Sequence, residues 1–182
     1  MLSSQKINGL CLRPGKIFSF WKTVGPPNAK NGFVEGRAIK QQVLQKEVGG
    51  GLCQLSGLFY LFALESGLQV IERHSHSVDI YKESERFSPL GSDATIVYGY
   101  KDLQFKNSLN TDIVFFVDVK RDRLSLEART ENRIDRYNII FDRTSETKKQ
   151  VTVQTYRQKD SESSLHEKEY IGESVYDKLA MN

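Results

Sequence analysis

Apolar residues recur at helical spacing in one segment of the chain. From Leu52 to Ala63 they lie three or four positions apart, and the pattern stops before Gly67. Three consecutive glycines, residues 49–51, precede the segment. An apolar stripe of this period, bounded by glycines, is typical of an amphipathic helix. The pattern therefore predicts one helix over residues 52–66.

Strand patterns surround this helix. Short runs rich in β-branched and aromatic residues, separated by turn-forming residues, favour strands. Such runs cover residues 68–73, 77–82, 94–100, the surroundings of Phe105, 113–119 and 124–128. The first 47 residues contain frequent proline and glycine, so we expect short strands and turns there. One helix among many strands predicts the α+β class, with a central helix that begins at a Gly-Gly-Gly-x-Cys turn and packs on a mostly antiparallel sheet.

Chain length and C-terminal composition predict one folded domain followed by a tail. A chain of 182 residues fits a single domain. Val151, Val153 and Tyr156 can extend the sheet, whereas the sequence beyond them is too polar to offset the entropy lost on ordering. We therefore expect a domain over residues 1–157 and a polar, irregular C-terminal tail over residues 158–182.

Composition and charge narrow the classes of partner. Hydrophobic residues make up 38% of the chain, which together with 13 glycines fits a globular protein with a core. A net charge of +3 is too small to indicate a nucleic-acid partner. No run approaches the roughly 18 apolar residues of a membrane helix, and no export signal follows Met1. These features leave the localisation open between the cytoplasm, for the chain as given, and the cell envelope, if the chain is part of a longer exported protein.

Cys53 is the first candidate for chemistry. It falls in the first turn of the predicted helix, where free backbone N–H groups and the helix dipole favour a thiolate. Gly50 and Gly51 permit positive φ and the close approach of a substrate backbone. The N–H groups of Cys53 and Gln54, together with the Gln54 side chain, are candidate oxyanion donors. Taken alone, Cys53 equally fits a small buried apolar residue beside a tight turn.

Two later residues complete a candidate catalytic triad. His76 and then Asp93 follow Cys53 in the chain, in or beside predicted strands. This order allows a thiol, a base and its orienting carboxylate to meet at the start of the helix. His74 shares a strand face with His76 and is the alternative base. Asp102 is the alternative carboxylate.

The histidines and cysteines of the chain do not indicate a metal site. His74 and His76 could pair as ligands, but Cys53 and acidic residues alone would have to complete a zinc site, so we expect no metal and no cofactor. Cys11 is the second of two cysteines. Without a dense cysteine framework, it is expected to be a free thiol in the core.

Two further side chains are candidates for substrate binding, along with Gly50 and Gly51. Arg73 can bind a carboxylate, or it can pair with Glu72 or Asp79 across strands. Trp21 can edge a ligand cleft, although its position among other aromatic residues also fits the core.

The sequence resembles the VanW family, named for an accessory protein of B-type vancomycin resistance clusters. The resemblance runs from about Ile7 to Asn107 and is carried by separate motifs in the family's order. These motifs are Asn8-Gly9, Pro14-Gly15-Lys16-Ile17-Phe18-Ser19-Phe20, Gly49-Gly50-Gly51-Leu52-Cys53-Gln54-Leu55-Ser56, Glu72-Arg73 with His76, Gly91 with Asp93-Ala94-Thr95, and Asp102-Leu103 with Phe105 and Asn107. The resemblance implies a cell-envelope or glycopeptide-resistance context and leaves the reaction open.

A second similarity is to transglutaminase-like cysteine enzymes. In these enzymes a Gly-x-Cys helix start is followed by histidine and aspartate on adjacent strands, as Gly51-Leu52-Cys53, His76 and Asp93 are in this chain. Ser77 departs from the pattern, because those enzymes carry an aromatic residue after the histidine. The similarity implies a transglutaminase-like form of the α+β fold.

These residues support hypotheses from different classes. The leading one is a thiol acyl-transfer enzyme, an amide hydrolase or transpeptidase-like enzyme acting on cell-wall peptides, with Cys53 as nucleophile, His76 as base and acid, and Asp93 as orienting carboxylate. The alternative is a non-catalytic binding module for a peptidoglycan precursor or a protein partner, with residues 49–54 as an anion-binding nest. A purely structural domain is the third.

Overall fold

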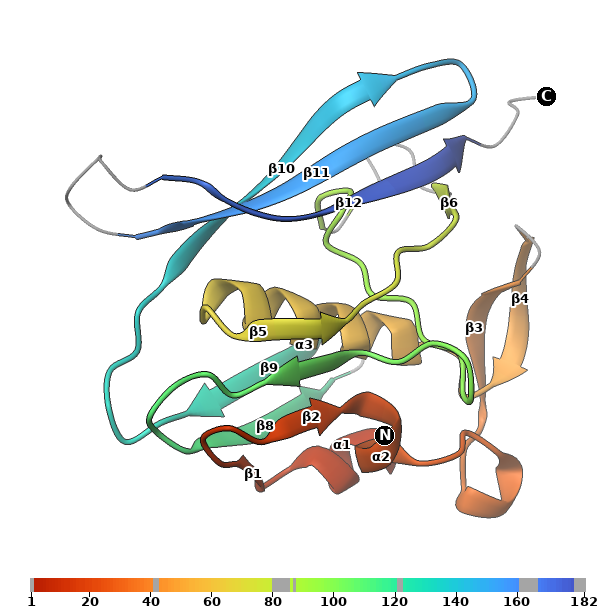
Figure 1. The fold of residues 1–182 in the computed structure, drawn as a ribbon. Helices are drawn as coiled ribbons and strands as arrows, with labels where there is room; N and C mark the ends of the chain where they lie inside the picture. The colour runs from red at the N-terminus through yellow and green to blue at the C-terminus, as the bar shows by residue number, and fades with distance from the viewer. Residues whose placement is uncertain are drawn as a thin grey trace.

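Short helices and antiparallel sheets make up the protein, which confirms the α+β class (Figure 1). The computed structural model describes residues 2–40, 43–79, 86, 88–120, 123–160 and 167–178. The strands do not form the single sheet that the sequence suggested. Within the described residues they divide into sheets of three, four, three and two strands around one central helix.

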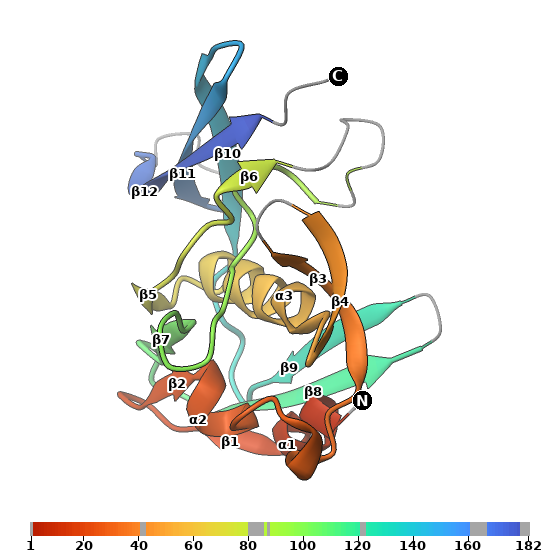
Figure 2. The same cartoon turned by 90° about the vertical axis from the view of Figure 1, so that its right-hand side faces the viewer.

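The N-terminal region contains helices as well as the expected strands and turns. Its elements are α1 (Leu2–Ile7), β1 (Leu10–Leu12), β2 (Ile17–Ser19), α2 (Phe20–Val24), the 3₁₀ turn η1 (Ala29–Asn31), β3 (Glu35–Lys40) and β4 (Val43–Val48). Strand β2 stops because the Ser19 side chain accepts a hydrogen bond from the Lys22 N–H and caps α2. Strands β3 and β4 pair as a hairpin that stands beside the central helix (Figure 2).

The central helix, α3 (Leu52–Glu65), agrees with the predicted range. It contacts β5 (Gln69–Glu72), β9 (Leu124–Arg129) and β10 (Tyr137–Glu146), so sheets surround it on several sides (Figure 2). Because it is enclosed in this way, α3 buries residues around most of its circumference. These are Leu52, Leu55, Ser56, Phe59, Tyr60, Ala63 and Leu64.

Stacked aromatic rings form the core between α3 and two three-stranded sheets. One sheet has the order β2-β7-β5, with β7 at Gln104–Lys106, and the other has the order β1-β8-β9, with β8 at Ile113–Val119. The Phe18 ring stacks on Phe59 and Phe105, with centroids 4.8 and 4.7 Å apart. Phe115 meets Phe59 edge-on. These contacts fix the position of α3 relative to both sheets.

Two of the strands expected after the helix differ in the structure. Residues 94–100 are not a regular strand, because a bridge between Val97 and Lys101 folds the chain into a tight turn. The strand expected over residues 77–82 is represented by β6 (Val78–Asp79), and residues 80–82 lie outside the described part of the chain.

A long-stranded sheet occupies the C-terminal region and lies above α3 in Figure 1. Its order is β10-β11-β12-β6, with β11 at Gln150–Lys159 and β12 at Glu169–Lys178. The expectation of an irregular tail is therefore wrong for β12. Alternate residues of the sheet bury Val151, Val153 and Tyr176 around Leu90, and this apolar contact offsets the cost of ordering. The domain limits themselves stay a prediction.

The described residues include no helix with the length and hydrophobicity needed to cross a membrane.

Removing a central ring tests the packing. We expect Phe105→Ala to lower the free energy of unfolding by about 3–5 kcal/mol, because the fully buried Phe105 ring stacks on Phe18 and Phe59 and its loss leaves a cavity. Urea unfolding followed by circular dichroism measures the change. Ile17→Ala, at a residue 53% exposed, is the control and is expected to stay within about 0.5 kcal/mol of wild type. Equal effects of the two substitutions would contradict this packing.

Candidate active site

The start of α3 presents Cys53. Gly51 occupies the position before the helix with φ of 88°, in the left-handed region that favours glycine, and it supplies no side-chain cap. Leu52 turns into the core, and Cys53 is partly exposed. The thiol therefore lies in the first helical turn, where the helix dipole favours negative charge.

Three groups surround the Cys53 sulfur. The His76 side chain and the backbone N–H of Ile96 both act on the sulfur and lower the pKa of Cys53, and the Thr95 Oγ1 lies 3.9 Å away. Ser56 holds the 94–96 segment against the helix by hydrogen-bonding the carbonyl of Ala94. All three groups can donate to a thiolate, so the surroundings favour the charged form of sulfur.

His76 is bound to Asp93 on the side away from the sulfur. Its Nδ1 lies 2.7 Å from Asp93 Oδ2, and its backbone N–H donates to the same oxygen at 2.6 Å. Both contacts fix the imidazole and leave its other nitrogen for Cys53. The side chains of His76 and Asp93 are 26% and 25% exposed, so the pair is partly shielded from water.

The second oxygen of Asp93 is also engaged. Asp93 Oδ1 accepts hydrogen bonds from Tyr176 Oη at 2.5 Å and from an Arg73 amino group at 3.2 Å. With the two donors from His76, the carboxylate accepts four hydrogen bonds. A carboxylate so satisfied remains ionised and is fixed in orientation.

The pKa values follow from these contacts. Burial raises the pKa of Asp93, but the His76 hydrogen bond and the Arg73 charge outweigh burial and lower that pKa to about 2. Burial lowers the pKa of His76, but the bonds to Asp93 and Cys53 raise it to about 9. Burial likewise raises the pKa of Cys53, while His76, the Ile96 N–H and Thr95 bring it below the usual value. These shifts both favour the pair of a thiolate and an imidazolium over the neutral pair, relative to an isolated thiol and imidazole.

The alternative base and carboxylate lie elsewhere. His74 Nε2 pairs with Glu72 Oε1 at 3.0 Å. Asp102 accepts hydrogen bonds from the Ser19 hydroxyl and from the Trp21 N–H, which ties β2 and α2 to the chain before β7. Of the four candidates, the structure brings His76 and Asp93 together with Cys53.

The candidate oxyanion donors differ in availability. In the described part of the chain, the Cys53 N–H donates to no acceptor, as expected in a first helical turn. The Gln54 N–H instead donates to the Gly51 carbonyl at 3.2 Å. The Gln54 side chain is exposed. Gly50 and Gly51 are partly exposed in the turn just before the thiol.

The hydrogen-bond donors of Arg73 are bound to acceptors within the protein. Its guanidinium donates to the Asp93 carbonyl at 2.8 Å, the Gly91 carbonyl at 2.9 Å and the Ser174 hydroxyl at 2.5 Å, and it stacks over Tyr60. The expected pairing with Glu72 or Asp79 is replaced by Asp93. With each guanidinium nitrogen already donating, Arg73 is an internal tie rather than an open substrate contact.

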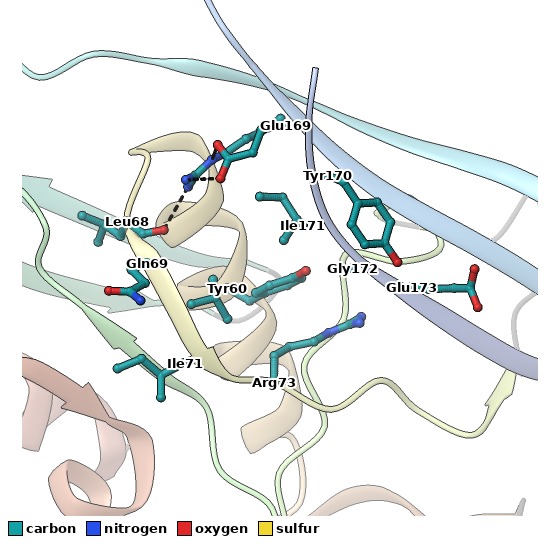
Figure 3. Close-up of a pocket in the computed structure, with 12 residues that line it drawn as sticks. Tyr60, Leu68, Gln69, Ile71, Arg73, Glu169, Tyr170, Ile171, Gly172 and Glu173 are labelled. Carbon is teal, nitrogen blue, oxygen red and sulfur yellow. Dashed lines mark hydrogen bonds and ion pairs between the residues drawn. The ribbon is translucent and has the colours of Figure 1, made fainter. Parts of the chain in front are cut away.

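Two surface cavities are lined by residues other than Cys53, His76 and Asp93. One, of about 490 Å³, is lined by Trp21, Tyr98, Tyr100 and Glu72, and the Trp21 Nε1–H is fixed to the Lys101 carbonyl at 2.8 Å. The other, of about 350 Å³, lies between β5 and β12 (Figure 3). Arg73 reaches across it toward β12, and Tyr60 from α3 forms its inner wall (Figure 3).

Cys11 is exposed, so its expected place in the core is wrong. The strand β1 alternates, and because Leu12 faces inward, Cys11 faces outward, with its sulfur 3.4 Å from Asp112 Oδ2. Both cysteines are free thiols, as the sequence predicted. The described residues contain no cluster of three or more side chains suited to hold a metal.

Sequence reasoning missed Thr95 and Tyr176. Thr95 lies two positions after Asp93, and its closeness to that carboxylate in the chain was the available clue. Tyr176 belongs to the segment taken for a polar tail, and only the pairing of β12 with β11 brings it to Asp93.

The fold and the site define an α+β protein in which a cysteine, a histidine and an aspartate meet at the start of a buried helix. The model of the family described as VanW like protein matches residues 1–129, so the chain belongs to this family. This confirms the resemblance seen in the sequence.

Two curated relatives share a third of their aligned residues with the chain. Vancomycin B-type resistance protein VanW of Enterococcus faecalis is 33% identical over 121 residues, which cover 66% of this chain and 43% of the relative. Uncharacterized protein YoaR of Bacillus subtilis is 33% identical over 113 residues, which cover 62% of this chain and 36% of the relative. The chain thus spans less than half the length of either relative. No solved structure gives a significant match.

The lowered pKa of Asp93 makes a prediction about acid stability. The carboxyl titrates at about 2 in the folded protein against 3.8 as its reference value, so its stabilising effect is present above about pH 4 and is lost as the pH falls toward 2. We expect Asp93→Asn to have a lower free energy of unfolding than wild type at pH 5. At pH 2 this difference should be smaller by on the order of 2 kcal/mol. Urea unfolding across this range measures the difference.

Asp118→Asn is the matched control, because that carboxylate pairs with Lys120 on the surface with its side chain 60% exposed. Its difference from wild type should vary little with pH. If the difference in unfolding free energy between wild type and Asp93→Asn is the same at pH 5 and at pH 2, the pKa of Asp93 is not lowered by folding, and the prediction is wrong.

Proposed function

We propose that this protein is a thiol acyl-transfer enzyme acting on peptide or amide bonds, with cell-wall peptides as the substrate class. The observation that carries the proposal is the continuous chain of contacts from the Cys53 sulfur through His76 to Asp93. A structural cysteine needs no partner of this kind, whereas a nucleophile needs a base and the base needs an orienting group.

In the first step the Cys53 thiolate attacks the carbonyl carbon of the scissile amide. A carbon–sulfur bond forms, and the carbonyl oxygen takes the negative charge. The protonated His76 then transfers its proton to the leaving nitrogen, the carbon–nitrogen bond breaks, and an amine departs from a thioester on Cys53. Asp93 stabilises the imidazolium and remains ionised throughout.

The oxyanion is stabilised by the start of α3. The Cys53 N–H, which donates to no acceptor among the described residues, is the proposed donor, and the positive end of the helix dipole adds to its effect. The Gln54 N–H joins them only if it exchanges its 3.2 Å bond to Gly51 for the oxyanion. The exposed side-chain amide of Gln54 supplies a further donor from the solvent side.

The second step decides whether the enzyme is a hydrolase or a transpeptidase-like enzyme. Neutral His76 takes a proton from water or from a second amine, which attacks the thioester carbon and releases the Cys53 thiolate. Water yields a free carboxylate, and an amine yields a new amide. Gly50 and Gly51, without side chains, allow the acyl chain to approach the sulfur closely.

The cavity beside Trp21 is the proposed place for the rest of the substrate. Its walls combine the aromatic rings of Trp21, Tyr98 and Tyr100 with the carboxylate of Glu72. Apolar faces with a few fixed polar groups are usual in ligand sites. The chain segment that carries Tyr98 also carries Thr95 and Ile96, which contact the Cys53 sulfur, so the cavity and the thiol share one loop.

Two comparisons support the substrate class and the catalytic order. One relative is named as a vancomycin B-type resistance protein, which favours a cell-envelope context. Cysteine at a helix start followed by histidine and aspartate also corresponds to the transglutaminase-like order, with Ser77 as the departure from that pattern. We therefore include a transglutaminase-like origin of the site in the proposal as a fold-level analogy.

Thiol reactivity tests the proposal. In a Cys11→Ser background, which removes the exposed second thiol, we expect iodoacetamide to alkylate Cys53 with a midpoint below pH 9. His76→Ala removes the hydrogen bond and charge that lower the pKa of Cys53, so the midpoint should rise and the rate at pH 7 should fall about tenfold or more. His74→Ala, at the neighbouring histidine, should leave the profile unchanged.

Turnover separates the enzyme from the binding module. With cell-wall peptides analysed by mass spectrometry, Cys53→Ser should bind substrate as wild type does but lose cleavage or transfer by at least about a thousandfold. A Cys53 thiol that is inert, or indifferent to His76, would instead favour a non-catalytic module that binds a peptidoglycan precursor or protein partner at the helix start.

A further inference from the structure

The carboxylate of Asp93 lies where two parts of the chain meet. Its Oδ2 faces His76, which belongs to the segment after β5. Its Oδ1 faces β12, where the Tyr176 hydroxyl donates to it at 2.5 Å. The shortest contact to Oδ1 thus comes from a strand that lies well beyond residues 1–129, which match the family model.

We propose that Tyr176 is a positioning residue of the thiol site, and that the C-terminal sheet therefore completes a site whose Cys53, His76 and Asp93 all come from the family-matched region. Tyr176 touches neither the sulfur nor a substrate. It acts through Asp93, which in turn orients His76. The functional meaning of this inference rests on the proposed thiol chemistry.

The strand β12 is built to deliver this contact. Ser174 and Tyr176 lie two positions apart, so they share one face, and both are almost fully buried at 3% and 1% exposure. Val175, between them, is 44% exposed and faces the opposite side. The ring of Tyr176 packs against Leu90 and Val153 in the apolar cluster under the sheet, which fixes where its hydroxyl points.

Arg73 makes the same connection from the other direction. It starts at the end of β5, and its guanidinium bonds both the Ser174 hydroxyl and the Asp93 carboxylate, so it joins β12 to the 91–93 loop. Figure 3 shows its side chain extending from β5 to the region of Gly172 and Glu173 on β12. Asp93 Oδ1 is therefore held by two residues. Tyr176 donates a short neutral hydrogen bond, and Arg73 donates a longer one that carries a positive charge.

The phenol is suited to a permanent donor role. Burial and the negative charge of Asp93 both raise the pKa of Tyr176, so its proton is retained at any pH at which the site would work. Its O–H donates to Asp93 while the ring stays in the core. Replacing tyrosine by phenylalanine removes this donor to Asp93, together with the 3.4 Å bond that the hydroxyl accepts from Arg73, and keeps the ring that packs in the core.

Loss of the hydroxyl should weaken the alignment of Asp93. Oδ1 then keeps only the 3.2 Å contact to Arg73, and the carboxylate is freer to turn away from His76 Nδ1. A less firmly held imidazolium stabilises the Cys53 thiolate less well. We expect the midpoint of Cys53 alkylation to rise in Tyr176→Phe and the rate at pH 7 to fall about three- to tenfold, the size expected for one hydrogen bond.

The experiment compares alkylation profiles of full-length variants in the Cys11→Ser background. Tyr170→Phe is the matched control, because Tyr170 lies on the same strand, is 55% exposed and packs against Tyr156 rather than Asp93. The inference is supported by an upward shift in Tyr176→Phe with an unchanged profile in Tyr170→Phe. It is overturned by a Tyr176→Phe profile that coincides with wild type, or by equal shifts in both variants.

A second variant guards against misfolding. If Tyr176→Phe unfolds, Ser174→Ala removes the β12 hydroxyl that bonds both Arg73 and Tyr176 and leaves the Tyr176 hydroxyl in place. It should loosen both donors to Asp93 Oδ1 and move the midpoint in the same direction by a smaller amount. An unchanged midpoint in Ser174→Ala would then overturn the inference. An inert wild-type Cys53 would contradict the proposed function itself, whereas a reactive wild type with an unaltered Tyr176→Phe contradicts only the role of Tyr176.

Discussion

The ionised carboxylate of Asp93 is the constraint on which the site depends. Four donors, two from His76 and one each from Arg73 and Tyr176, converge on its two oxygens. A partly buried carboxylate with this many donors is held both charged and fixed. The orientation of His76 and the ionisation of Cys53 follow from it, because the imidazole can face the sulfur only while Asp93 holds its opposite edge.

The fold supplies these groups from separate layers that α3 brings together. Its first turn carries the thiol, the segment after β5 carries His76 and Arg73, and the C-terminal sheet carries Tyr176. Aromatic stacking of Phe18 on Phe59 and Phe105 anchors the helix on one side. Packing of β12 over the loop that contains Asp93 closes the other side, so stability and site geometry depend on the same contacts.

Local patterns predicted what depends on local sequence. The period of the apolar residues from Leu52 and the glycines before them predicted α3, and the order of Cys53, His76 and Asp93 predicted which side chains meet. Contacts between segments far apart in the sequence could not be predicted from local patterns. Nothing in the polar composition around Tyr176 indicated that β12 would pair with β11, and Cys11 could be assigned to the outside only once the inward face of β1 was known.

The most direct test of this account is the protonation of His76, followed by NMR of its ring nitrogens between pH 5 and 10 in wild type and in Asp93→Asn. The account predicts that wild-type His76 stays protonated through neutral pH and titrates at about 9, and that the midpoint falls when the Asp93 charge is removed. A wild-type midpoint near the ordinary value of 6.5, unaltered in Asp93→Asn, would contradict it.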